Sequence, residues 1–204
     1  MSTVASLVVG RDGSTSKDNS SNGVSSDADR SAFLARRRKV DCILIGGNTA
    51  RHEPYKQSPV PLVILSRSTI NPVVGNDLSH LWNMTPAQAL AKAKVQFGER
   101  ILIEAGTSII FELIDQGLID QLELSVTPVT GGDHPIDWQD LLNRFDLLAT
   151  DPHAPATLII THHIEEIPAG STHALLLKNG KIVGSGPIAG VITSENLSIA
   201  YDMQ

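Results

Sequence analysis

The sequence predicts an α/β fold with a mostly parallel sheet flanked by helices. Over the first two thirds of the chain, short apolar runs alternate with longer stretches that carry apolar residues on one face. Breaks rich in Gly, Ser and Asn separate these runs. Such alternation indicates strands joined by crossover helices, which requires parallel pairing. Hydrophobic residues make up 41% of the 204 residues and aromatic residues only 4%, so we expect an aliphatic core.

Each expected strand is an apolar run that stops at a polar or glycine break. The clearest helix signal is Thr85-Pro86-Ala87-Gln88, in which Thr85 caps the helix, Pro86 takes its first position and Gln88 completes a capping box. In chain order we expect a strand at 3–9, a polar loop at 14–26, a helix at 27–38, strands at 40–45 and 62–65, a helix at 86–97, a strand at 100–104, a helix at 107–116 and a strand at 122–126. The run of cations at 36–39 is interpreted as a solvated face at the end of the first helix.

Composition excludes several classes of protein. The net charge of −6 disfavours general nucleic-acid binding. A lone cysteine, Cys42, excludes an internal disulfide, and its apolar surroundings predict a buried strand thiol. No apolar run approaches the roughly 18 residues of a membrane span, and no signal peptide is evident, so we expect a cytoplasmic protein.

Three breaks, at residues 46–51, 66–68 and 104–108, follow expected strands. In parallel sheets, ligands bind beyond the carboxyl ends of the strands, so these breaks are candidate binding segments. Gly46 and Gly47 would let a ligand approach the backbone, Thr49 offers a hydroxyl, and Arg51 could grip a phosphate. A plain turn remains an alternative for the two glycines.

The other two breaks could also bind anions. Gly106, Thr107 and Ser108 lie where a strand leads into a helix, whose first amide groups are unpaired. Ser66 and Arg67 could hold a further phosphate, such as the one that distinguishes NADPH from NADH. Gly106 could instead serve helix–sheet packing, and Arg67 could be an ordinary exposed arginine. Residue types and spacing therefore indicate a phosphorylated ligand and no more.

An ordered set of segments resembles a known family. It is similar to the reductase domain at the C-terminus of the bifunctional riboflavin-synthesis deaminase-reductase, whose fold is related to dihydrofolate reductase. The matching segments are the first strand with Asp12-Gly13, the helix start at 25–30, Ile43 to Glu53, Ile101 to Ser108, Leu118 to Leu122 and Thr127-Pro128-Val129. The resemblance covers residues 3–145 and implies a dihydrofolate-reductase-like sheet flanked by helices.

The resemblance implies a function and a set of residue roles. The reaction would be NADPH-dependent reduction of a phosphoribosylaminopyrimidine in riboflavin biosynthesis, and related reductases are commonly dimers. In this protein the cofactor would contact Gly46, Gly47, Thr49, Arg51, Ser66, Arg67, Gly106, Thr107 and Ser108. Asp12 and Glu104 would face the substrate as the candidate catalytic residues. No metal is implied.

The chain departs from that family at two positions and in one segment. The family has a second glycine where Ala105 stands and a proline where Thr107 stands, and the stretch between Ser68 and Arg100 is shorter, with no strand expected in it. These departures favour an alternative function, a nucleotide-binding module without catalysis.

The tail resembles a different family. Residues 154–168 and the hairpin signal Asn179-Gly180 look like the end of an ABC-transporter ATPase, with His162 at the position of its switch histidine. An ABC-ATPase-related fragment is therefore a further alternative function, but the G-x-x-x-x-G-K-[ST] loop that such an ATPase needs does not occur in the chain. We therefore expect a reductase-like nucleotide-binding domain at 1–146 and an ABC-ATPase-like strand, hairpin and helix fragment at 147–204. Residues 157–161 would pair with the reductase sheet.

Overall fold

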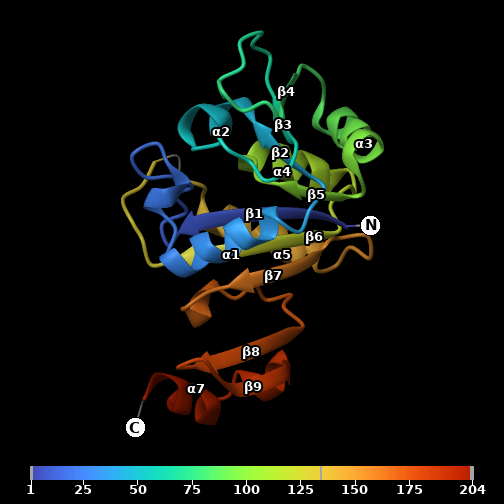
Figure 1. Cartoon of the computed structure of the whole chain (residues 1–204). Coiled ribbons are helices and arrows are strands. Elements are labelled where there is room, and N and C mark those ends of the chain that lie inside the picture. Colours follow the sequence, from blue (N-terminus) through green and yellow to red (C-terminus); the bar gives the residue numbers. More distant parts are fainter. Residues whose placement is uncertain (1, 134, 203–204) are drawn as a thin grey trace.

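The computed structural model describes residues 2–133 and 135–202, without the side chains of residues 27–29 and 138. Its elements are β1 (Ser2–Gly10), η1 (Ser21–Gly23), α1 (Asp27–Arg37), β2 (Cys42–Gly46), α2 (Gly47–His52), β3 (Leu62–Leu65), β4 (Ser79–Trp82), α3 (Pro86–Phe97), β5 (Arg100–Ile103), α4 (Thr107–Asp115), β6 (Gln121–Thr127), α5 (Trp138–Leu148), β7 (Ala156–Ile160), η2 (Ile164–Glu166), β8 (His173–Lys178), β9 (Lys181–Pro187), α6 (Ile188–Val191) and α7 (Ser194–Tyr201). Seven strands form one sheet in the order β4-β3-β2-β5-β1-β6-β7, and all its strand pairs are parallel (Figure 1). The α/β prediction is confirmed.

The central strands are buried because they are apolar throughout. Every residue of β2 and of β3 is buried, as expected of strands covered on both faces. Strand β6 alternates buried and half-buried residues instead, because its Gln and Glu side chains point to one face. Cys42 is fully buried, as predicted. Among the described residues, no helix is long and apolar enough to cross a membrane.

The capping box before α3 is confirmed. The Thr85 hydroxyl accepts a hydrogen bond from the Gln88 amide at 3.3 Å, and the Gln88 side chain accepts one from the Thr85 amide at 3.2 Å. Pro86 takes the first helical position, where a missing N–H costs nothing. The start of α3 is therefore determined by local sequence.

The structure corrects several sequence-based expectations. Helix α2 forms where no helix was predicted, strand β4 lies in the segment where no strand was expected, and α5 was not predicted. The cation run is only partly solvated. Arg38 and Lys39 are exposed, whereas Arg37 is buried and Arg36 is ion-paired with Glu123 of β6. The interpretation of this run as a solvated face is therefore wrong for Arg36 and Arg37.

The tail begins by extending the sheet. Strand β7 pairs with β6 in parallel, with Leu122 opposite Thr157 and Ser125 opposite Ile160, which confirms the expected pairing of this segment. Strands β8 and β9 form a separate antiparallel hairpin beyond β7 (Figure 1). Its turn residues Asn179 and Gly180 have φ values of 49° and 74°, which is the backbone that an Asn-Gly hairpin turn requires.

Candidate active site

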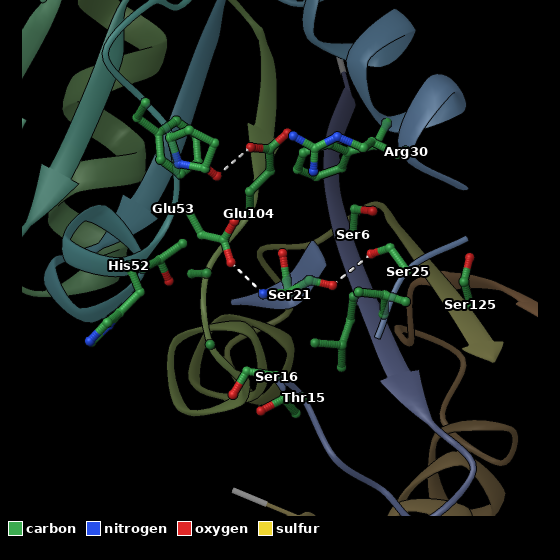
Figure 2. A pocket seen from close by; sticks show the side chains of 18 of the residues that line it. Ser6, Thr15, Ser16, Ser21, Ser25, Arg30, His52, Glu53, Glu104 and Ser125 are labelled. Atoms are coloured by element: carbon green, nitrogen blue, oxygen red, sulfur yellow. Dashed lines mark hydrogen bonds between the residues drawn. The ribbon is translucent and has the colours of Figure 1, made fainter. Parts of the chain in front are cut away.

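A hollow of about 200 Å³ lies between β1, α1, α2 and the carboxyl end of β5 (Figure 2). One wall is the loop that follows β1, which contributes Thr15, Ser16, Asn19 and Ser21. Helices α1 and α2 and the segment after α2 form the other walls. The hollow is rich in hydroxyl groups, which suit a ligand with many hydrogen-bonding oxygens.

A buried ion pair closes one side of the hollow. Arg37 of α1 donates to both oxygens of Glu104, from Nε at 3.0 Å to each oxygen and from Nη2 to Oε2 at 2.7 Å. The hydroxyl of Tyr55 donates to Glu104 Oε2 at 2.7 Å. The guanidinium also lies over the rings of Phe33 and Tyr55, at 4.3 and 4.5 Å from their centroids. Two aromatic rings and a bidentate carboxylate thus hold one buried cation.

Burial and charge shift the pKa values of this cluster. Burial raises the pKa of the Glu104 carboxyl, against the opposing hydrogen bonds from Arg37 and Tyr55. Burial also raises the pKa of Tyr55 well above its ordinary value, with the nearby carboxylate adding to the effect. For Arg37, burial alone would lower the pKa, but the hydrogen bonds and charge of Glu104 raise it. Arg37 therefore stays protonated, and Tyr55 stays a neutral donor at ordinary pH.

The loop wall is fastened on two sides. Glu53, directly after α2, accepts a hydrogen bond from the Ser21 amide (Figure 2). It also accepts one from the Ser20 hydroxyl at 3.3 Å. At the other end, the Asp12 carboxylate accepts from the Ser14 amide, the Ser14 hydroxyl and the Gly131 amide. The Ser14 hydroxyl, above all, lowers the pKa of Asp12 to about 2. Asp12 is exposed and does not line the hollow, so it shapes the wall from outside.

The three predicted binding breaks lie side by side. Strands β3, β2 and β5 are adjacent and parallel, so the segments after Leu65, Gly46 and Ile103 share one edge of the sheet. Gly47 packs so closely on Ser66 that an added Cβ would lie 2.9 Å from its side chain. Around Gly106 an added Cβ would meet nothing within 4 Å, which leaves open space before α4.

The structure brings only some of the predicted site residues into the hollow. Thr49, Glu104 and Gly106 line it. Thr107 and Ser108 line a second, shallower hollow between α4 and α5. Arg51 and Arg67 are exposed, and Arg51 donates to Asn48 at 3.3 Å. Gly46, Gly47 and Ser66 lie at the strand ends outside both hollows.

Sequence reasoning missed Arg37, Tyr55 and Glu53. The Arg-Arg-Arg-Lys run does not show which of its cations turns inward. That depends on which side of α1 faces Glu104, the residue directly after β5. Tyr55 follows a short helix that was not predicted, so its approach to Glu104 could not be anticipated. One available signal was the tyrosine itself, since a Tyr hydroxyl needs a hydrogen-bond partner when the ring is buried.

The parallel sheet, the helices on it and a hollow beside the carboxyl end of β5 define an α/β protein with a candidate ligand site at the strand ends. The sequence profile of the RibD C-terminal domain matches residues 3–151, and the chain belongs to that family. Two solved structures have a similar fold. A putative riboflavin biosynthesis protein from Shewanella sp. PV-4 is 19% identical, with a TM-score of 0.53 over 66% of this chain and 82% of that one. A pyrimidine reductase-like protein from Corynebacterium diphtheriae is 17% identical, with a TM-score of 0.52 over 66% and 78%.

Two curated proteins match part of the chain. A putative ABC transporter ATP-binding protein of Streptococcus mutans is 36% identical over 91 residues, which are 44% of this chain and 35% of that protein. The uncharacterized ABC transporter ATP-binding protein YlmA of Bacillus subtilis is 40% identical over 92 residues, or 44% and 34%. The chain thus spans about a third of the length of these relatives. Since fewer than 91 residues follow residue 151, this likeness overlaps the RibD match.

Proposed function

We propose that this chain is an NADPH-dependent reductase that acts on a phosphoribosylaminopyrimidine-type substrate in riboflavin biosynthesis. The observation that carries the proposal is the meeting of three strand ends beside one hydroxyl-rich hollow that contains Glu104, Thr49 and Gly106. Membership of the RibD C-terminal family and the names of the two structural relatives support it.

The residues at the strand ends fit a dinucleotide. Gly106 opens space before α4, and no side chain caps that helix, so its first amide groups are available to a diphosphate. Thr107 and Ser108 would add hydroxyls there. Thr49 and Arg51 on α2, behind Gly46 and Gly47, would contact the same ligand. Ser66 and the exposed Arg67 would hold the adenosine phosphate of NADPH.

In such a site the cofactor supplies the hydride, and the protein supplies orientation and electrostatics. Both oxygens of Glu104 accept hydrogen bonds from Arg37 or Tyr55, so we assign Glu104 a role in positioning that cluster against the substrate. Asp12 would act at one remove, by fixing the loop wall through Ser14 and Gly131.

Binding of the reduced cofactor tests the proposal first. We expect saturable fluorescence enhancement of NADPH by the purified chain, with weaker binding of NADH. Turnover of a phosphoribosylaminopyrimidine, followed as loss of NADPH absorbance, then tests the substrate. Absence of binding to either dinucleotide would remove the reductase proposal.

Arg67 is the residue proposed to distinguish the two dinucleotides. We expect Arg67→Ala to weaken NADPH binding by about 1.5–3 kcal/mol and NADH binding much less, because one charged hydrogen bond to the extra phosphate is lost. Arg38→Ala is the matched control, since Arg38 is also exposed. An equal loss for NADPH and NADH would show that Arg67 does not contact that phosphate.

One observation favours a second function, a nucleotide-binding module without catalysis. Glu104 is only 5% exposed and its carboxylate is engaged by Arg37 and Tyr55, so it offers little to a substrate. NADPH binding without turnover of any aminopyrimidine would support this alternative.

Family resemblance also leads us to propose a cytoplasmic homodimer. Sedimentation of the purified chain would test the dimer, with a monomer at micromolar concentration counting against it. We further propose that the division at residues 146 and 147 separates two units of different ancestry.

A further inference from the structure

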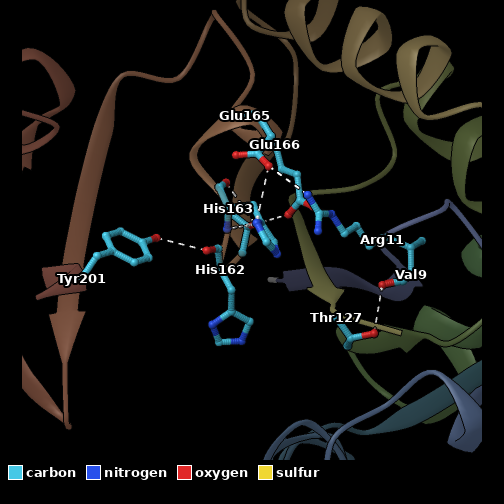
Figure 3. A network of polar contacts seen from close by, with 9 residues as sticks. Val9, Arg11, Thr127, His162, His163, Glu165, Glu166 and Tyr201 are labelled. Atoms are coloured by element: carbon cyan, nitrogen blue, oxygen red, sulfur yellow. Dashed lines mark hydrogen bonds and ion pairs between the residues drawn. The ribbon is translucent and has the colours of Figure 1, made fainter. Parts of the chain in front are cut away.

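In the part of the chain that the structure describes, Arg11 joins the tail to the wall of the hollow through ion pairs. Arg11 directly follows β1 and begins the loop that forms that wall. Its Nη2 donates to Glu165 Oε1 at 3.0 Å, and its Nε lies 3.9 Å from Glu166 Oε1 (Figure 3). Both glutamates belong to η2, which lies beyond the stretch that matches the RibD family.

The two glutamates differ in burial. Glu165 is exposed and also lies 3.4 Å from His163 Nδ1. Glu166 is only 3% exposed, and one of its oxygens accepts from the Thr161 hydroxyl. Its other oxygen, Oε1, is buried without a hydrogen bond and is the one that faces Arg11. A buried carboxylate is costly unless a cation compensates it, so Glu166 depends on Arg11.

The first turn of the loop is rigid, so a displacement of Arg11 is transmitted to the loop residues that line the hollow. The Gly10 amide donates to the Ser14 carbonyl at 2.7 Å, and the Gly13 amide donates to the Gly10 carbonyl at 2.9 Å. Gly13 has a φ of +80° and lies so close to Ile136 that no side chain would fit there. Thr15 and Ser16, the first loop residues that line the hollow, follow directly after this turn. A shift of Arg11 therefore moves them.

We propose that the Arg11–Glu166 ion pair is a positioning contact by which the tail holds the ligand-facing loop in place. Arg11 and Glu166 do not touch the ligand in this scheme. They act through the Gly10–Ser14 turn on the residues that do. The effect on ligand affinity rests on the proposed function, whereas the effect on loop order does not.

Hydrogen–deuterium exchange of the full chain tests the contact without any ligand. We expect Arg11→Met and Glu166→Gln each to speed amide exchange in residues 14–25 about tenfold, because each substitution removes one partner of the ion pair that involves the buried carboxylate. Exchange in β2 and β5 should not change. Arg38→Met is the control, since it removes the same charge from an exposed site.

A double variant separates positioning from simple instability. Arg11→Met with Glu166→Met removes both charges, so no unpaired carboxylate stays buried and the chain should fold. We expect the loop to exchange rapidly in this variant too, and NADPH affinity to fall about tenfold while NADPH remains preferred over NADH. Loop exchange equal to wild type in the double variant would overturn the proposal. If wild type binds no NADPH, the reductase proposal fails, but the exchange result still decides this one.

Discussion

At the scale of single residues, Glu104 offers the most direct test of the site. Its carboxylate compensates the charge of Arg37, which is itself buried. Glu104→Gln would leave the buried guanidinium of Arg37 without a counter-charge. We expect the free energy of unfolding to fall by about 3 kcal/mol, measured by urea denaturation.

The matched control is Glu99→Gln, at an exposed glutamate directly before β5. That substitution should change the free energy of unfolding by less than about 0.5 kcal/mol. If both substitutions have the same small effect, the buried ion pair does not contribute as the geometry indicates.

The lowered pKa of Asp12 predicts that the fold loses stability in acid. Its pKa falls from the ordinary value of 3.8 to about 2 in the fold, chiefly because of the Ser14 hydroxyl. A lowered folded pKa means that Asp12 stabilises the fold above pH 3.8, and that this stabilisation is lost as the pH falls through about 2.

We therefore expect Asp12→Asn to lower the urea midpoint at about pH 5 and much less at about pH 2, where about half of the wild-type carboxyl is protonated. Because Asp12 is exposed, the effect should be modest. A difference between wild type and variant of the same size at both pH values would contradict this assignment.

At the scale of elements, α3 shows how local sequence sets a helix boundary. The capping box at Thr85 and Gln88 satisfies two amide groups that the helix itself leaves unpaired. Thr85→Ala should lower the free energy of unfolding by about 1 kcal/mol. Thr69→Ala, in an exposed bend, is the control and should have almost no effect. Equal losses in thermal denaturation would show that the cap does not stabilise the helix.

Helices α2 and α5 contrast with α3. Helix α2 contains Gly47, Asn48 and Thr49, which are poor helix formers, and it exists because Ala50 packs into the core beside β2 and β3. For α5 the signal was present, since Asp137 caps the helix and Leu141 and Phe145 lie one turn apart on its buried face. Helix α2 therefore depends on tertiary packing, whereas the Asp137 cap and the spacing of Leu141 and Phe145 are local signals that predict α5.

At the scale of the whole molecule, the tail divides into a part that belongs to the sheet and a part that does not. Strand β7 pairs along β6, and the amide of Gly170 donates to the Asp146 side chain of α5 at 3.0 Å. The hairpin of β8 and β9 is packed by α6 and α7 and keeps Leu175, Leu177 and Ile182 more than half exposed.

Two truncations test this division. A chain that ends after Gly170 should unfold cooperatively at nearly the wild-type temperature, because β7 and Glu166 remain. A chain that ends after Ala149 should unfold at a clearly lower temperature, because it loses β7 and uncovers the edge of β6. Identical melting of the two truncated chains in calorimetry would show that β7 adds nothing to the fold.

The sequence by itself determined the fold class, the strands from β1 to β3 and β5 to β6, the cap of α3 and the edge of the sheet at which the three breaks meet. These features depend on apolar periodicity and on local hydrogen bonds, both of which can be read from neighbouring residues. The tertiary structure alone decided that Arg37 turns inward to Glu104, that Tyr55 joins it, and that Arg11 reaches Glu166. Those contacts join residues 49 to 155 positions apart, so they depend on how the elements pack and not on the residues around them.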